Sequence, residues 1–262
     1  MRGRTKLVSL AAIFTVFVVT SAVFASGLVN VSRTSLFGTP IYPDSPDSVV
    51  FVDPGTIIKD YLDDPGYQIG NTFQVHVNIT GAVDLFSYQV NLTWNPAILS
   101  YSSYTYGEFL ARTGSAYGTS RSQPTYIADN VAGYVSVAET ILGDVAGITG
   151  DGRLFTIEFL ILDYGATSIG IGTGGELPTK LLESTGVDHL YTVTNGYFRN
   201  GLSGDANLDK AINVFDILAV KGHWGETPAS PGWIREVDVN DDAAINVFDI
   251  LVVKANWGRT VP

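Results

Sequence analysis

Two copies of one segment near the C-terminal end place the strongest constraint on how this chain folds. The first copy begins at Asp205 and the second at Asp238, an offset of 33 residues. Both read Asp-x-Asn-x-Asp-x-Ala-Ile-Asn-Val-Phe-Asp, and both continue as Ile-Leu-x-Val-Lys-x-x-Trp-Gly. Because self-similarity at a fixed period marks one structural unit used twice, the repeat predicts a small module with internal symmetry.

Each copy has the ligand spacing of a calcium-binding loop. Oxygen-bearing side chains occupy loop positions 1, 3, 5, 9 and 12, and position 7 offers a backbone carbonyl. Asp and Asn are also common in ordinary polar turns, but two matches in register favour calcium. We therefore predict two Ca²⁺ ions, held by Asp205, Asn207, Asp209, Ala211, Asn213 and Asp216 and by Asp238, Asn240, Asp242, Ala244, Asn246 and Asp249.

The loops differ from the EF-hand pattern in two places. Position 6, where Gly usually makes the sharp turn, is Lys210 in the first copy and Ala243 in the second. A left-handed backbone at these residues would cost roughly 1 to 2 kcal/mol, so either the turn differs or the affinity is lowered. Position 12 is Asp rather than Glu. No entering helix is evident before Asp205, so each copy consists of a loop and an exiting helix.

This combination resembles a type I dockerin over residues 204–258. The resemblance implies a calcium-dependent module whose helices bind a cohesin module on another protein through either repeat. The family's recognition positions fall on Val214, Phe215, Lys221 and Gly222 and on Val247, Phe248, Lys254 and Ala255. The alternative is that Val214 and Phe215, at the start of an amphipathic helix, belong to the core of the module. Because so small a module has a small core, we expect calcium binding to be coupled to its folding.

The N-terminal residues read as an export signal. Arg2, Arg4 and Lys6 precede an uncharged apolar run over residues 7–24, and Ala25 suits a cleavage site. The alternative is an uncleaved membrane anchor, since the run approaches the length of a bilayer span. We predict a signal peptide over residues 1–25, a polar, proline-containing spacer over 26–47, and a mature protein that is secreted, extracellular or attached to the cell surface.

Composition narrows the class of partner. The formal net charge is −11 at pH 7, which argues against nucleic acid and anionic membranes because both attract basic patches. The chain has no Cys, so no disulfide framework is possible. Metal binding and core burial must therefore hold the fold together.

Residues 48–199 are dominated by short alternating runs that predict half-buried strands. Phe73, Val75, Val77 and Ile79 alternate with polar residues, as do the residues of 86–94. About nine strands are expected, without a convincing long helix, and the predicted fold is an antiparallel β-sandwich. A short linker, 200–204, separates it from the C-terminal module over 205–262.

The order of landmarks in this region resembles a cohesin. Asp53-Pro54, the run from Phe86 to Leu99 containing Trp94-Asn95-Pro96, and the segment from Gly150 to Phe159 carry the likeness, which spans about 48–200. The resemblance implies a nine-stranded jelly roll, one face of which receives a dockerin. The alternative is a carbohydrate-binding module delivered to a complex by its dockerin. A sugar-stacking platform would use Tyr101, Tyr104, Tyr106, Tyr117 and Tyr126, although such residues more often pack against a sheet.

Catalysis finds little support in the sequence. His76, His189 and His223 stand in no recognisable nucleophile or zinc pattern, and the acids of residues 53–158 show no motif. We predict a non-catalytic scaffold or adaptor of a cellulosome-type assembly, which binds a cohesin-bearing protein through the dockerin and a dockerin-bearing protein through the sandwich. Binding to a polysaccharide remains the alternative.

Overall fold

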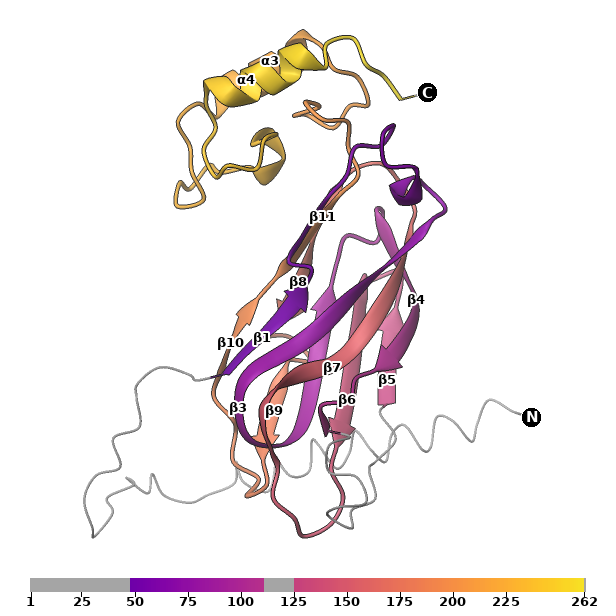
Figure 1. Cartoon of the computed structure of the whole chain (residues 1–262), viewed down its shortest axis with the longest axis vertical. Helices are drawn as coiled ribbons and strands as arrows, with labels where there is room; N and C mark the ends of the chain where they lie inside the picture. The colour runs from indigo at the N-terminus through magenta and orange to yellow at the C-terminus, as the bar shows by residue number, and fades with distance from the viewer. Residues whose placement is uncertain (1–47, 111–124, 262) are drawn as a thin grey trace. The chain divides into compact units, whose positions relative to one another are not determined.

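The computed structural model describes residues 48–110 and 125–261 (Figure 1). The expected signal peptide, the spacer and Tyr117 therefore lie outside the described residues. Eleven strands and two α-helices follow one another along the described chain. The strands are β1 (Ser48–Asp53), β2 (Thr56–Ile58), β3 (Thr72–Thr93), β4 (Leu99–Tyr106), β5 (Thr125–Asp129), β6 (Tyr134–Thr140), β7 (Ile148–Ile161), β8 (Ala166–Gly172), β9 (Lys180–Glu183), β10 (Tyr191–Thr194) and β11 (Gly196–Arg199).

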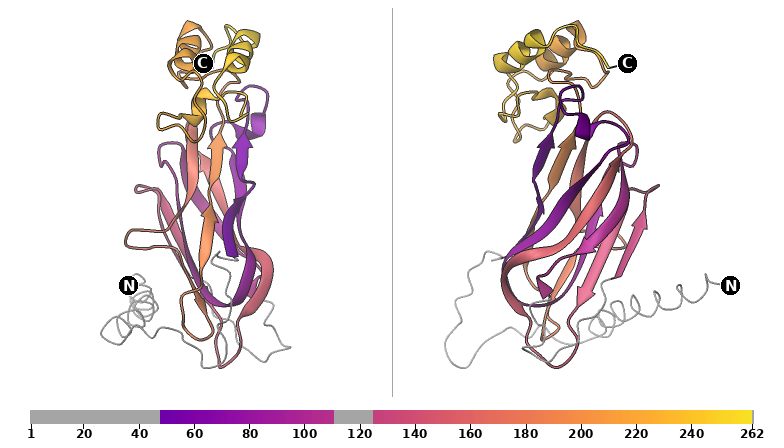
Figure 2. Two further views of the ribbon diagram at one scale, coloured as in Figure 1. Left: turned by 90° about the vertical axis from the view of Figure 1, so that its left-hand side faces the viewer. Right: turned by 45° about the vertical axis from the view of Figure 1, so that its right-hand side comes forward.

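The long strand β3 organises the sandwich because it belongs to both layers. Its first half pairs with β1 and β7, and its second half pairs with β6, β8 and β9. Register shifts between Ile79 and Leu85 mark where the strand changes layer, since bulges bend a strand locally. Figure 2 shows the resulting curled sheet from two sides. Most pairs are antiparallel, but β1 with β10 and β2 with β11 are parallel.

Alternating side chains of these strands fill one core between the layers. Tyr88, Val90 and Leu92 of β3 are fully buried and meet residues of β7 such as Phe155 and Phe159. The hydroxyl of Tyr88 donates to Glu139 Oε2 at 2.9 Å, so this buried polar group is satisfied. The period-two pattern thus predicted correctly which residues of β3 face the core.

The expectation of a β-rich sandwich is confirmed, whereas several strand limits were wrong. The two runs 73–79 and 86–94 form one strand, β3. The sequence analysis also missed β2, β5 and β9, which have three to five residues each. Strands this short carry too few alternations to produce a period-two signal.

The C-terminal module consists of α3 (Val214–Gly222), the short 3₁₀ helix η3 (Arg235–Val237) and α4 (Val247–Ala255). Asn213 and Asn246 cap the two α-helices in the same way, each within a capping box completed by Asp216 or Asp249. A second core lies here, formed by Ile212, Val220, Ile245, Val253 and their neighbours. None of the helices among the described residues is long and apolar enough to cross a membrane.

Candidate functional site

The two predicted calcium loops have almost the same geometry around position 1. Asp205 Oδ1 accepts the backbone N–H of Asp209 at 3.2 Å, and its Oδ2 accepts that of Lys210 at 2.9 Å. In the second loop Asp238 accepts from Asp242 and Ala243 at the same two distances. Each loop therefore turns back over the carboxylate of its first residue, as a short loop must do to surround one cation.

The last residue of each loop closes it from the other side. Asp216 Oδ2 accepts the backbone N–H of Asn213 at 2.8 Å, and its Oδ1 accepts that of Ala206 at 2.8 Å. Asp249 Oδ2 likewise accepts from Asn246 at 2.8 Å. A single carboxylate thus caps the exiting helix and ties it to the start of the loop.

The residues at positions 3 and 5 lie beside one another on the exposed rim of each loop. Asn207 Nδ2 donates to Asp209 Oδ2 at 2.9 Å, and Asn240 Nδ2 donates to Asp242 Oδ2 at 2.8 Å. The side chain at position 9 also caps the helix that follows the loop. Asn213 Oδ1 accepts the N–H of Phe215 at 2.8 Å as a helix cap, so it has only its second lone pair for a cation or a bridging water.

The turn at position 6 is left-handed in both loops, although neither residue is Gly. The φ angle is +74° at Lys210 and +66° at Ala243. Position 4 is left-handed as well, with +57° at Leu208 and +54° at Asp241. The EF-hand turn is therefore kept, at the conformational cost that side chains carry in this region.

The first and last residues of each loop are buried carboxylates. Asp205, Asp216 and Asp249 are completely buried and Asp238 nearly so. Among the described residues no Lys, Arg or His forms an ion pair with any of the four. Burial raises the pKa of Asp216 and of Asp238, and a neighbouring carboxylate in the same loop adds to both shifts. Because buried charges are normally paired or bind metals, these loops suit a cation.

The donor set fits calcium and suits softer metals poorly. No group of three or more His, Cys, Asp or Glu in the described part of the chain is arranged to hold a metal. Each loop instead mixes carboxylates with amide oxygens and a backbone carbonyl, which are the ligands of a hard cation. The residues that would hold it are those at positions 1, 3, 5, 7, 9 and 12.

Each helix presents an exposed apolar strip above its loop. Phe215 is 60% exposed and Phe248 is 58% exposed, and their neighbours Val214, Leu218, Val247 and Leu251 are exposed as well. The alternative that buried Val214 and Phe215 in the core is therefore wrong. Ile212 and Val220 form the core instead. Lys221, Gly222, Lys254 and Ala255, the remaining predicted partner-binding residues, are also exposed.

Sequence analysis missed Trp224 and Trp257 as part of this surface. Both are 53% exposed and follow the ends of α3 and α4 at the same position of the repeat. Exposed aromatic residues are enriched at protein interfaces. The signal was present in the sequence, because a Trp that recurs at the 33-residue offset stands outside the apolar helix pattern.

Where β3 pairs with β6, two polar side chains are buried on the face of the sheet opposite the core, which the sequence did not indicate. Asn91 on β3 pairs with Ser136 on β6, and both side chains point away from the core residues that alternate with them. Asn91 Oδ1 and Ser136 Oγ are buried without a hydrogen-bond partner among the described residues. Unsatisfied buried polar atoms are uncommon and call for an explanation.

The tyrosines of β4 and β5 form a cluster rather than a flat platform. The rings of Tyr104 and Tyr126 lie 4.5 Å apart at an angle of 51°, and those of Tyr101 and Tyr126 lie 5.8 Å apart. Tyr101 and Tyr104 pack against the core. This confirms the packing interpretation for those two residues, while Tyr106 and Tyr126 remain more exposed.

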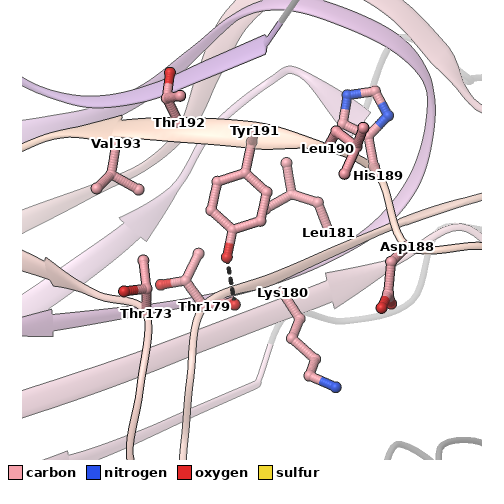
Figure 3. A pocket seen from close by; sticks show the side chains of 10 residues that line it. All are labelled: Thr173, Thr179, Lys180, Leu181, Asp188, His189, Leu190, Tyr191, Thr192 and Val193. Carbon is pink, nitrogen blue, oxygen red and sulfur yellow. Dashed lines mark hydrogen bonds between the residues drawn. The ribbon is translucent and has the colours of Figure 1, made fainter. Parts of the chain in front are cut away.

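No recognisable catalytic arrangement emerges around the histidines of the described residues. His189 Nε2 lies 2.6 Å from Ser48 Oγ, but Ser48 is completely buried and also contacts the carbonyl of Gly81. His189 lines a pocket of about 670 Å³ between β9 and β10. Figure 3 shows the Tyr191 ring in its wall, with the hydroxyl donating to the Thr179 carbonyl at 2.6 Å. His76 and His223 contact Thr156 and Glu226.

Comparison with known proteins agrees with this division into two modules. The cohesin domain model matches residues 61–187, and the dockerin type I domain model matches residues 203–256. A search of curated proteins finds no match.

Solved structures with a similar fold include a non-cellulosomal cohesin from the hyperthermophilic archaeon Archaeoglobus fulgidus, which is 17% identical and has a TM-score of 0.43 over 62% of this chain and 96% of that one. Another is the third cohesin ScaC of Acetivibrio cellulolyticus in complex with the ScaB dockerin, at 15% identity and a TM-score of 0.45, over 59% and 99%. The second type II cohesin module of that organism's adaptor ScaA scaffoldin is 16% identical, with a TM-score of 0.44 over 61% and 99%.

Proposed function

This chain joins a cohesin domain to a type I dockerin domain, and from that premise we propose that it is a secreted, non-catalytic adaptor whose dockerin binds its partner only when calcium is present. The proposal is carried by one observation. Each repeat combines buried carboxylates, which have no ion-pair partner among the described residues, with an exposed apolar strip on its helix. Calcium would neutralise the carboxylates and fix the loop, and the loop in turn fixes the start of the helix that carries Phe215 or Phe248.

The partner of the dockerin is a cohesin-bearing protein. Val214, Phe215, Leu218 and Lys221 of α3 are exposed, and so are their counterparts on α4. An apolar anchor flanked by a basic residue suits a partner face that is apolar at its centre and acidic at its rim. Because the two strips are nearly identical in sequence and exposure, either repeat can bind, and loss of one strip should leave the other functional.

The sandwich supplies the complementary half of the adaptor and accepts a dockerin from a second protein. The carbohydrate-binding alternative is not favoured, because Tyr101 and Tyr104 pack inward.

Capture of purified modules tests the proposal. The full chain is immobilised and exposed to a panel of type I cohesins, first in calcium and then in EDTA. We expect calcium-dependent capture of at least one cohesin, unchanged in Phe215→Ala or Phe248→Ala alone and lost in the double variant. Capture that persists in EDTA, or that survives the double variant, would contradict the proposal. Lys180→Ala on the sandwich serves as a matched control that leaves both strips intact.

A further inference from the structure

The sandwich reaches into one of the two calcium loops and not into the other. Tyr164 lies between β7 and β8, and its hydroxyl donates to Asp205 Oδ2 at 2.6 Å. The same hydroxyl accepts the backbone N–H of Leu202 at 2.6 Å. Tyr164 is almost completely buried.

The second loop receives no equivalent contact. In the described part of the chain the carboxylate of Asp238 accepts only from the backbone of its own loop, namely Asp242 and Ala243. These two bonds match those that Asp209 and Lys210 make to Asp205. The carboxylates at position 1 are therefore held alike by their own loops, and the contact from Tyr164 is an addition from outside.

Two further sandwich residues hold the first loop. Arg199, which is buried at the end of β11, donates from Nη2 to the Asp205 carbonyl at 2.6 Å and from Nη1 to the Glu236 carbonyl at 3.1 Å. Asp163 pairs with Lys210 Nζ at 3.3 Å. The first loop is thus fixed at its first residue and at its left-handed turn, both by residues of the sandwich.

We propose that Tyr164 is a positioning residue for the first calcium loop, and that it makes two repeats of nearly identical sequence unequal in calcium affinity, with the first loop the tighter. This rests on the proposed calcium function. Tyr164 and Lys210 hold Asp205 Oδ2 and the backbone of Asp209 holds Oδ1, so the carboxylate is oriented before a cation would bind. Residues that orient a ligand from outside the coordination sphere change metal affinity by about 10-fold to 100-fold when they are removed.

The effect is reciprocal, because binding and contact formation are linked in free energy. Calcium in the first loop fixes Asp205, and a fixed Asp205 strengthens the contact with Tyr164. Calcium should therefore tighten the attachment of the dockerin to its own sandwich. Loading of the second loop should have no such effect.

The test is a calorimetric titration of the full chain with calcium, one loop at a time. Asp249→Asn disables the second loop so that the first is measured alone, and Asp216→Asn does the reverse. Tyr164→Phe is then added to each background. Tyr61→Phe is the matched control, since Tyr61 packs against Tyr164 with ring centroids 5.5 Å apart but does not contribute a hydrogen bond to Asp205.

We expect the first loop to bind more tightly than the second, and Tyr164→Phe to weaken only the first, by about 10-fold or more. Tyr61→Phe should leave both affinities unchanged. Equal affinities, or an equal loss at both loops in Tyr164→Phe, would overturn the inference, because the tyrosine would then act on general stability. If neither loop bound calcium in the wild-type chain, the proposed function itself would fail, an outcome distinct from two equal sites.

Discussion

The guanidinium of Arg259, near the end of the chain, forms two hydrogen bonds with Asp60 of the sandwich, at 2.8 Å to Oδ2 and 2.9 Å to Oδ1. The two residues lie 199 positions apart in sequence. Asp60 Oδ2 also accepts the backbone N–H of Ser203 at 2.8 Å. One carboxylate thus ties the dockerin to the sandwich at its beginning and at its end.

Replacing Arg259 by Ala should weaken this attachment. Asp60 is mostly buried, so removing its partner leaves a carboxylate short of hydrogen bonds, and hydrogen bonds to charged groups contribute about 2 kcal/mol. We expect a loss of that order in the free energy of unfolding of the dockerin, measured by urea denaturation with tryptophan fluorescence. Trp224, Trp233 and Trp257 report on this module, whereas Trp94 reports on the sandwich.

Lys59→Ala is the control for Arg259→Ala. Its ion pair with Asp64 is 3.9 Å long and partly exposed at both ends, and such pairs contribute little. If Lys59→Ala lowered the free energy of unfolding as much as Arg259→Ala, the contact between Arg259 and Asp60 would contribute no more than a surface ion pair.

The attachment should weaken in acid. Burial alone would raise the pKa of Asp60, but hydrogen bonds from the backbone of Ser203 and Leu62 and from Arg259 outweigh it and hold the pKa below its usual 3.8. A carboxylate with a lowered folded pKa stabilises the folded state above its unfolded pKa, and loses that contribution as the pH falls through the folded value. Asp60→Asn should therefore differ most from wild type above about pH 4 and converge with it below. A difference that stayed constant into stronger acid would contradict this.

The left-handed turn at position 6 offers a stabilising substitution. Ala243 has φ near +66°, where Gly has no steric penalty, so Ala243→Gly should stabilise the second loop by about 1 kcal/mol. Calcium titration and urea unfolding both measure this. Ala244→Gly, one residue later, is the matched control and should be neutral or destabilising because it only adds flexibility to the unfolded chain. Equal gains from both variants would rule out relief of strain.

Substitutions of surface and of core residues in the dockerin should differ clearly in their effect on the free energy of unfolding. Phe215→Ala is expected to change the free energy of unfolding by less than about 0.5 kcal/mol, because the side chain is mostly exposed. Ile245→Ala removes a completely buried side chain and should cost about 3 kcal/mol. A large stability loss in Phe215→Ala would mean that Phe215 belongs to the core and would remove it from the binding surface.

The buried hydroxyl of Ser136 can be compared with that of Ser87. Ser136→Ala removes a buried Oγ that has no partner among the described residues, so we expect an unchanged or slightly raised free energy of unfolding. In contrast, Ser87→Ala loses a hydrogen bond of 3.1 Å to the Glu139 carbonyl and should destabilise the chain by about 1 kcal/mol. Urea denaturation measures both variants, and a loss in Ser136→Ala as large as that in Ser87→Ala would contradict this expectation.

The sequence predicted those structural features that depend on the pattern of neighbouring residues. The repeat indicated both loops and both helices, and period-two alternation indicated the core side of β3 with Tyr88, Val90 and Leu92. It also identified Lys210 and Ala243 as departures from the EF-hand pattern, but it did not decide whether the turn there is left-handed. These features require only neighbouring residues, so one chain read in order is enough to find them.

Long-range contacts could not be predicted in this way. The sequence predicts that residues 200–204 are a short linker between the sandwich and the dockerin. In the structure two contacts cross from one module to the other, Arg259 to Asp60 and Tyr164 to Asp205. Nothing in the local pattern around Tyr164 distinguishes it from a core tyrosine. The pairing of Asn91 with Ser136 likewise depends on the register of two distant strands, which alternation alone does not fix.

The number of calcium ions bound by the intact chain tests the account most directly. Calorimetric titration of the full-length protein at pH 7, after removal of metal with EDTA, should show two ions per chain and a gain in the free energy of unfolding of the dockerin. Binding of two ions would support loops in which Asp205, Asp216, Asp238 and Asp249 surround cations. No binding, or binding without any change in stability, would contradict the proposal that calcium organises the surface through which this protein assembles.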